Sequence, residues 1–266
     1  MGHPARECFQ SPRMPPINTA KMRKSLYAFL FPMLGVACAL AQTPEPGKAA
    51  VQPKARPPWE LEWAYLSKYH DADARLGPAG PTENRVVFLG DSITEGWGNA
   101  DGNFFATRSY VNRGIGGQTT SQMLVRFRQD VIGLKPAVVV ILGGTNDIAE
   151  NGGITTLEAI EGNLQSMVEL AGANGIHVVL ASVLPTLDYP WRPGLNPRDK
   201  IAALNNWMRQ FSHRNHLVYL DYYSAMVDAH GALRPELSKD GVHPTSAGYL
   251  IMEPLADKAI RSALKG

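Results

Sequence analysis

Four short polar segments of the sequence contain the side chains best suited to chemistry. They are 90–92 (GDS), 114–119 (GIGGQT), 143–147 (GGTND) and 238–249 (SKDGVHPTSAGY). A serine hydroxyl is a weak nucleophile unless a neighbouring base accepts its proton, and histidine is the usual base. The four segments therefore hold the components of a nucleophilic site.

Ser92, His243 and Asp240 form the first predicted constellation. Asp240 lies three residues before His243, and a tight turn at Gly241 would fold its carboxylate onto the imidazole. Such a carboxylate sets the tautomer of the histidine and stabilises the imidazolium that forms when the serine loses its proton. We predict a catalytic triad of these three residues, on the condition that the last loop lies beside the first.

Acyl transfer also requires donors for the negative charge that develops on the substrate oxygen. The candidates are the backbone N–H of Ser92, the backbone N–H of Gly117 and the side-chain amide of Asn146. Glycine allows close approach of the backbone to a substrate, and asparagine supplies a donor without a charge. These three groups form the predicted oxyanion hole.

Each segment also has an ordinary structural interpretation. The GDS triplet is a common turn, GIGG can cap a helix or bind phosphate, and Asn146 with Asp147 can cap a loop. A lone Asp-x-x-His is most often a surface pair. The other histidines after residue 41 have no comparable neighbours and are interpreted as structural or surface residues: His70, His177, His213, His216 and His230.

Apolar runs alternate with helical patterns along most of the chain. Runs rich in β-branched residues predict strands at 86–90, 110–115, 137–144, 177–185 and 217–222. Helices are predicted at 59–76 and at about 119–134, 155–174, 197–213 and 245–265. This alternation predicts a doubly wound α/β domain with a parallel sheet, in which functional residues gather at the carboxyl ends of the strands.

The N-terminal part of the chain has the layout of an export signal. Basic residues follow Met22, an apolar stretch runs to Leu40, and a small-x-small pattern ends at Ala41. We predict a signal peptide within 1–41, with the natural start at Met22, and export to the periplasm or the medium. The apolar stretch is shorter than the roughly 20 residues that span a bilayer, so we expect no stable membrane insertion after cleavage. A lipoprotein attached through Cys38 is a minor alternative.

The remaining chain divides into a linker and one domain. Residues 42–58 contain five prolines and predict an extended linker, which leaves 59–266 as the domain. Without residues 1–41 the chain has 21 basic and 23 acidic residues, a net charge of −2. It then has no basic patch for nucleic acid, and no cysteine for a disulfide, a thiol nucleophile or a metal site.

The four segments together closely resemble the SGNH hydrolases, the GDSL-type esterases and lipases. The resemblance runs from about residue 84 to 264, with all four blocks in order. It matches Ser92 to the nucleophile, Gly117 and Asn146 to the oxyanion residues, and Asp240 and His243 to the acid and base. One departure is Gln118, where many relatives have an acidic residue, and it leaves the geometry of that loop open.

The resemblance implies a three-layer α/β/α sandwich, flavodoxin-like, around a central five-stranded parallel sheet, with neither a metal nor an organic cofactor. It implies hydrolysis of esters through an acyl-enzyme, and it places the chain near the acetylhydrolases and carbohydrate acetylesterases. We therefore expect a short-chain, acetyl-type serine esterase acting on a small-molecule or carbohydrate ester. A lysophospholipase or thioesterase of the same family is the alternative, and a binding module that kept the fold without the chemistry is a second.

Aromatic residues near these loops are candidates for substrate contact. The proline-rich segment 186–197 contains Tyr189 and Trp191, and Trp97 follows Ser92 by five residues. An aromatic ring in such a loop could stack on a sugar ring, but the same residues bury readily in a packed core. We predict Trp97, Tyr189 and Trp191 as substrate-binding residues, with core packing as the other interpretation.

Overall fold

The computed structural model describes residues 62–100 and 102–266. The sheet consists of β1 (Val86–Gly90), β2 (Tyr110–Gly114), β3 (Val138–Leu142), β4 (His177–Ala181) and β5 (Val218–Leu220). The helices are α2 (Ser67–Leu76), α3 (Ser92–Ala100), α4 (Gly102–Ala106), α5 (Thr120–Asp130), α6 (Thr145–Ile148), α7 (Leu157–Ala173), α8 (Arg198–Arg214), α9 (Tyr223–Met226) and α10 (Ser246–Ala263). Single 3₁₀ turns lie at Ile132–Leu134 and Pro235–Leu237.

The five strands form one parallel sheet in the order β2-β1-β3-β4-β5. This order confirms the predicted five-stranded parallel sheet of the flavodoxin-like type. Strand β1 pairs with β2 on one side and with β3 on the other, so the strand order reverses at β1. Ligands of open α/β sheets bind outside the carboxyl ends of the strands at such a reversal. The chain leaves β1 at this point and enters α3 at Ser92.

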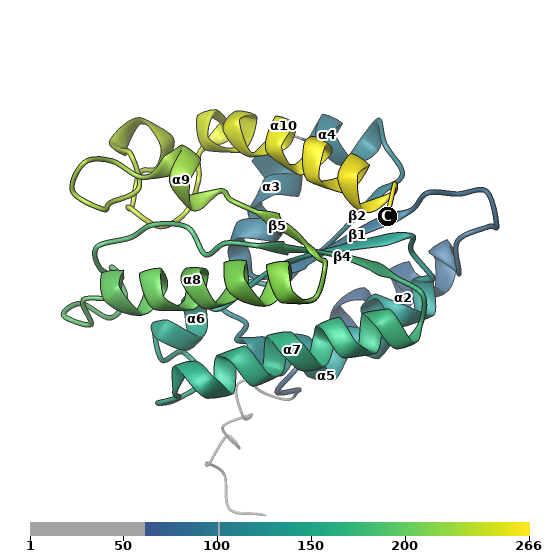
Figure 1. The fold of residues 1–266 in the computed structure, drawn as a ribbon, viewed down its shortest axis with the longest axis horizontal. Coiled ribbons are helices and arrows are strands. Elements are labelled where there is room, and N and C mark those ends of the chain that lie inside the picture. Colours follow the sequence, from purple (N-terminus) through teal and green to yellow (C-terminus); the bar gives the residue numbers. More distant parts are fainter. Residues whose placement is uncertain (1–61, 101) are drawn as a thin grey trace, which may run out of the picture. The chain divides into compact units, whose positions relative to one another are not determined.

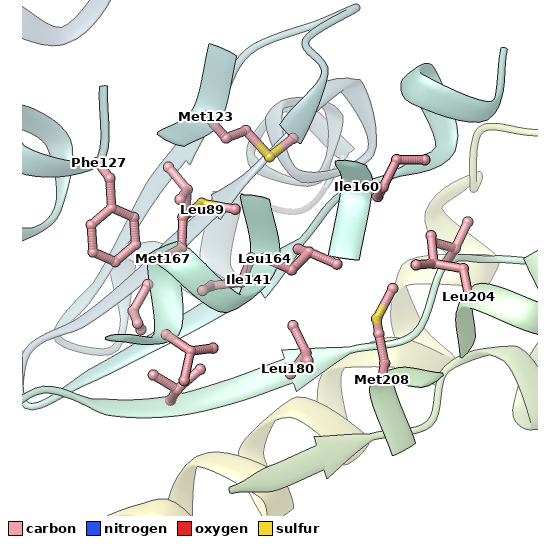
Figure 2. Close-up of a cluster of buried hydrophobic side chains, with 14 of the residues drawn as sticks. Leu89, Met123, Phe127, Ile141, Ile160, Leu164, Met167, Leu180, Leu204 and Met208 are labelled. Atoms are coloured by element: carbon pink, nitrogen blue, oxygen red, sulfur yellow. The ribbon is translucent and has the colours of Figure 1, made fainter. Parts of the chain in front are cut away.

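Helices cover both faces of the sheet, as Figure 1 shows. On one face, alternate strand side chains such as Leu89, Ile141 and Leu180 pack against α5, α7 and α8. Figure 2 shows this cluster, including Met167 of α7 and Met208 of α8. On the other face, the intervening side chains pack against α3, α4 and α10. Because successive strand residues point to opposite faces, a strand buried on both sides must be apolar throughout, as β1 and β3 are.

The structure differs from the predicted elements mainly around Ser92. The sequence indicated a turn there, but Ser92 is the first residue of the nine-residue helix α3. Asp91 explains this local start, because its Oδ1 accepts a hydrogen bond of 2.9 Å from the backbone N–H of Ile93 at the helix N-terminus. The predicted strand at 177–185 ends at Ala181, where the chain leaves the sheet for the loop before α8. The other strands lie within two residues of their predicted bounds, and so do α7, α8 and α10. Two helices are shorter than predicted: α5 ends at Asp130 instead of 134, and the helix predicted at 59–76 begins only at Ser67.

An N-terminal segment, residues 62–76, packs on the edge of the domain beside α5, and we call it the strap. Three glutamine side chains donate to its backbone carbonyls: Gln118 to Ala64, Gln122 to Trp63 and Gln129 to Leu66. The predicted signal peptide, the predicted linker and the start of the helix predicted at 59–76 lie outside the described residues. Among the described residues, no helix combines the length and the apolar character needed to cross a membrane.

Candidate active site

Ser92, His243 and Asp240 lie together at the carboxyl edge of the sheet. Ser92 Oγ is 3.0 Å from His243 Nε2, and His243 Nδ1 is 2.7 Å from Asp240 Oδ2. The serine follows the end of β1, and the other two residues come from the loop before α10, where His243 lies 151 positions later in the chain. Both ring nitrogens of His243 are therefore engaged, one by a carboxylate and the other by a hydroxyl that can lose its proton.

The carboxylate of Asp240 is held in place by its own loop. Its Oδ1 accepts hydrogen bonds from the backbone N–H groups of Val242 and His243, at 2.9 and 2.8 Å. Gly241, directly after Asp240, has a φ of +78°, a conformation that favours glycine. Partial burial raises the pKa of Asp240, but these backbone bonds and the imidazole of His243 outweigh it and lower the pKa to about 2. Asp240 is therefore ionised throughout the neutral range.

The loop that follows β2 brings Gly117 to the site. Gly117 has a φ of +76°, and a Cβ there would meet open space, so the backbone conformation favours glycine while the surroundings do not exclude a side chain. Gly116 packs closely, because a Cβ on it would lie 3.0 Å from Glu95 Oε2, with the Cβ of Ser92 at 3.7 Å. Its N–H donates to Glu95 Oε2 of α3 at 2.7 Å. The loop is thus tied to the helix that begins with Ser92.

The side chain of Asn146 is buried and fixed at both ends. Its Nδ2 donates to the backbone carbonyl of Gln118 at 3.1 Å, and its Oδ1 accepts from Nδ2 of Asn151 at 2.6 Å. Asn151 in turn accepts a bond of 2.9 Å from Nε1 of Trp191. These contacts identify which atom of the Asn146 amide is the nitrogen donor. They place this Nδ2 beside the loop that contains Gly117.

Gln118, the departure from the family pattern, joins two elements. Its Oε1 accepts a bond of 2.6 Å from Nε of Arg126, and its Nε2 donates to Ala64 of the strap. The buried guanidinium of Arg126 also donates to the carbonyls of Gly90 and Arg113, both at 2.8 Å. An acidic residue in place of Gln118 could accept from Arg126 but could not donate to Ala64. The glutamine therefore suits a loop that has the strap beside it.

Asp91 is fully buried beneath the site. Burial raises the pKa of its carboxyl to about 7, against the opposing effects of the Ile93 N–H and the imidazole of His243. Its Oδ1 accepts from Ile93, whereas Oδ2 has no hydrogen-bond partner among the described residues. The bonded oxygen ties Asp91 to the first turn of α3.

The three aromatic residues predicted to contact substrate have different positions. Trp97 is 1% exposed and stacks on Phe104 and Tyr249, with ring centroids 4.6 and 5.4 Å away. Tyr189 is 0% exposed, and its hydroxyl lies 3.0 Å from the Thr145 Oγ1. Burial contradicts the prediction for both: their rings are core residues and cannot reach a substrate.

Trp191 is the third of these residues and has a different environment. Its ring is 45% exposed and lies 5.9 Å from the ring of His243. It is therefore accessible to a substrate at the candidate triad.

Among the described residues, no three histidine, cysteine, aspartate or glutamate side chains are grouped as a metal site.

Sequence reasoning did not identify Asn151, Glu95 or the strap as parts of this site. Asn151 is followed by two glycines, a pattern typical of a turn, and Glu95 lies three residues after Ser92 in a segment for which no element was predicted. Glu95 acts through Gly116, which lies in the loop after β2, and Asn151 acts through Asn146, which lies in α6. The one available signal was the spacing of Asn151 five residues after Asn146, which places both in the same short loop region.

The flavodoxin-like α/β/α fold and these contacts are those of a GDSL-type hydrolase, and comparison with known proteins agrees. The model of the GDSL-like lipase/acylhydrolase family matches residues 88–251, and the chain belongs to this family. It is a carboxylic ester hydrolase. A GDSL-like lipase from Bacteroides thetaiotaomicron VPI-5482 is 46% identical, with a TM-score of 0.75, and the match covers 76% of this chain and all of that one.

Two relatives differ in how much of their length they share with this chain. An acetylxylan esterase from Geobacillus stearothermophilus is 26% identical over 201 residues, which are 63% of this chain and 90% of that protein. The uncharacterized lipoprotein YqeF of Bacillus subtilis (strain 168) is 35% identical over 81 residues, 29% of this chain. The chain covers 33% of the length of that lipoprotein. The strap lies outside the segment that the family model matches.

Proposed function

We propose that Ser92 is the nucleophile of this esterase, with His243 as its base and Asp240 as the group that orients the imidazole. The observation that carries the proposal is the pair of contacts at His243, 3.0 Å to Ser92 Oγ and 2.7 Å to Asp240. His243 accepts the Ser92 proton as Oγ attacks the ester carbonyl. It then protonates the departing alcohol, leaving an acyl group on Ser92. Water, activated by the same imidazole, releases the acid and restores the serine.

The negative charge of the tetrahedral intermediate is assigned to three donors. They are the backbone N–H of Ser92, the backbone N–H of Gly117 and Nδ2 of Asn146. The contacts of the Gly116 backbone with Glu95 and of Asn146 with Asn151 support this assignment, because they fix the donors before substrate arrives. Preorganised donors stabilise charge more effectively than donors that must reorient during the reaction.

We further propose that the acyl group is short, acetyl first, and that the alcohol is a carbohydrate. The similarity to an acetylxylan esterase supports this choice, as does the exposed ring of Trp191 beside His243. The arrangement of basic, apolar and small residues between Met22 and Ala41, with the similarity to a lipoprotein, supports export from the cytoplasm. A lipid attached at Cys38 is the alternative form of the exported protein.

Replacement of the nucleophile tests the mechanism directly. Ser92→Ala should abolish covalent labelling by a fluorophosphonate and reduce the hydrolysis of 4-nitrophenyl acetate by about 10³-fold or more, because the acyl-enzyme cannot form. Thr107→Ala, on the surface of the same protein, is the control for loss of a hydroxyl. Labelling of Ser92→Ala to the same extent as the unmodified protein would refute the assignment. A preference for octanoyl over acetyl esters would refute the short acyl group.

A further inference from the structure

A cavity of about 420 Å³ opens beside the oxyanion loop, between that loop and the strap. Its lining includes Trp63 and Tyr65 of the strap, Gly117 of the loop, and Glu95, Gln122 and Asn151. Gly117 is one of the proposed oxyanion donors, and Asn151 holds another, Asn146. The cavity therefore adjoins the position at which the ester carbonyl must lie.

The strap holds its part of the lining in a fixed position. Gln122 donates to the carbonyl of Trp63 itself at 2.6 Å, and Gln118 donates to that of Ala64 at 2.8 Å. Further along the strap, the carboxylate of Asp73 forms a buried ion pair with Arg113 of β2. The wall that carries Trp63 is thus attached both to α5 and to the sheet.

The lining is polar, with its charges paired. Lys68 Nζ lies 2.8 Å from Glu95 Oε1, so the cation and the carboxylate at the cavity neutralise one another. Gln122 and Asn151 contribute amides, and Ile115 is the one aliphatic side chain among the lining residues. About half of the lining is polar, so an alkyl chain filling the cavity would leave the amides and the ion pair without partners, whereas a hydroxylated ring would offer them donors and acceptors.

Exposed tryptophan is concentrated around this cavity. Among the described residues, the tryptophans with the most exposed side chains are Trp63, at 58%, and Trp191, at 45%. Trp63 lines the cavity, and Trp191 is hydrogen-bonded to Asn151, which lines it as well. An exposed indole presents a flat apolar face with a polar edge, which suits a sugar ring with an apolar face and polar rim.

We propose that this cavity, with Trp63 as its stacking platform, binds a neutral sugar unit on the leaving-group side of the ester. The inference deepens the proposed function and rests on it. The volume of the cavity far exceeds that of an acetyl group, and its polar groups are unsuited to a long acyl chain. We therefore assign the cavity to the alcohol part of the ester. The strap lies outside the segment matched by the family model, so the family pattern does not include the strap side of this subsite, which carries Trp63, Tyr65 and Lys68.

A binding experiment tests the subsite without requiring turnover. The full chain with Ser92→Ala is titrated with xylotetraose and with maltotetraose by calorimetry, and again with Trp63→Ala added. Loss of the stacking face should weaken binding of at least one of the two sugars about tenfold. Val125→Ala, an exposed apolar residue on α5 outside the cavity, should leave binding unchanged. Trp63→Ala keeps the backbone carbonyl that Gln122 holds, so the variant should retain its circular dichroism spectrum.

Three outcomes would overturn the subsite. They are no binding of either sugar at millimolar concentration, equal affinity with and without Trp63, and binding of octanoate that depends on Trp63. In active enzyme, Trp63→Ala should lower the ratio of kcat/KM for acetylated xylooligosaccharides to that for 4-nitrophenyl acetate by about tenfold. A wild-type chain inactive on every acetate ester would instead refute the proposed function, so the two failures can be told apart.

Discussion

The buried carboxyl of Asp91 should make the stability of this protein depend on pH in an unusual direction. Burial raises its pKa to about 7 in the folded chain, against 3.8 for an unperturbed aspartate. Between these values the folded state retains the proton while the unfolded state releases it. The free energy of unfolding should therefore fall as the pH rises through this window, by about 1.4 kcal/mol per pH unit and about 4 kcal/mol in total. Above the folded pKa both states are ionised and the contribution is constant.

Asp91→Asn isolates this contribution. Asparagine can still accept from the Ile93 N–H through Oδ1, and it does not titrate. Any cost of its additional N–H donor is independent of pH and leaves the slope unchanged. The assay is urea unfolding of both proteins from about pH 4.5 to pH 8, with the difference between them plotted against pH. Wild type should lose about 3 kcal/mol relative to Asp91→Asn over this range, all of it below about pH 7.

A control variant is compared in the same plot of the difference in the free energy of unfolding against pH. Asp199→Asn removes a carboxyl whose side chain is 95% exposed, so its difference curve should be nearly flat. If the Asp91→Asn curve is equally flat, Asp91 is ionised in the folded chain at low pH and the inference from burial is wrong. A curve that rises with pH would mean that the folded state stabilises the charged form.

Three further predictions concern the oxyanion loop and its support. Asn146→Ala should lower kcat for 4-nitrophenyl acetate by about 10²-fold, because it removes an oxyanion donor. Asn151→Ala should lower kcat by about tenfold with little change in KM, because it removes a hydrogen bond that orients the Asn146 amide. An equal kcat for Asn151→Ala and wild type would contradict that positioning role. Gly114→Ala should destabilise the fold by about 3 kcal/mol, because its Cβ would lie 2.1 Å from the backbone nitrogen of Glu95. Gly162→Ala, on an open face of α7, is the matched control and should be neutral or stabilising in thermal unfolding.

The sheet could be predicted because its strands carry their own signal. A parallel strand covered on both faces must be apolar at every position, and Val86–Gly90 and Val138–Leu142 satisfy this requirement locally. The polar segments that follow could be assigned to one edge for the same reason, since the carboxyl ends of parallel strands lie together. The contact of Ser92 with His243 across 151 positions was thus predictable in outline, although its distance was not.

The aromatic residues show where the sequence alone is insufficient. Trp97 lies five residues after Ser92 and was a reasonable candidate for substrate contact, yet it is buried between Phe104 and Tyr249. Its position depends on α3 starting at Ser92 itself, which turns the ring toward α10. Trp191, in a proline-rich loop with no clear periodicity, is the one predicted aromatic residue that remains accessible. Exposure depends on which elements pack together, and neighbouring residues in the sequence do not decide that.

The sequence by itself determined the order and type of the elements, the four polar segments and the family to which they belong, because each depends on residue type and short spacing. Only the tertiary structure decided which groups support them. Asn151 orients Asn146, Gln118 joins Arg126 to the strap, and Trp63 lines a cavity beside Gly117. These relations are hydrogen bonds and surfaces between segments that fold together, and their geometry exists only once the sheet has brought the loops to one edge.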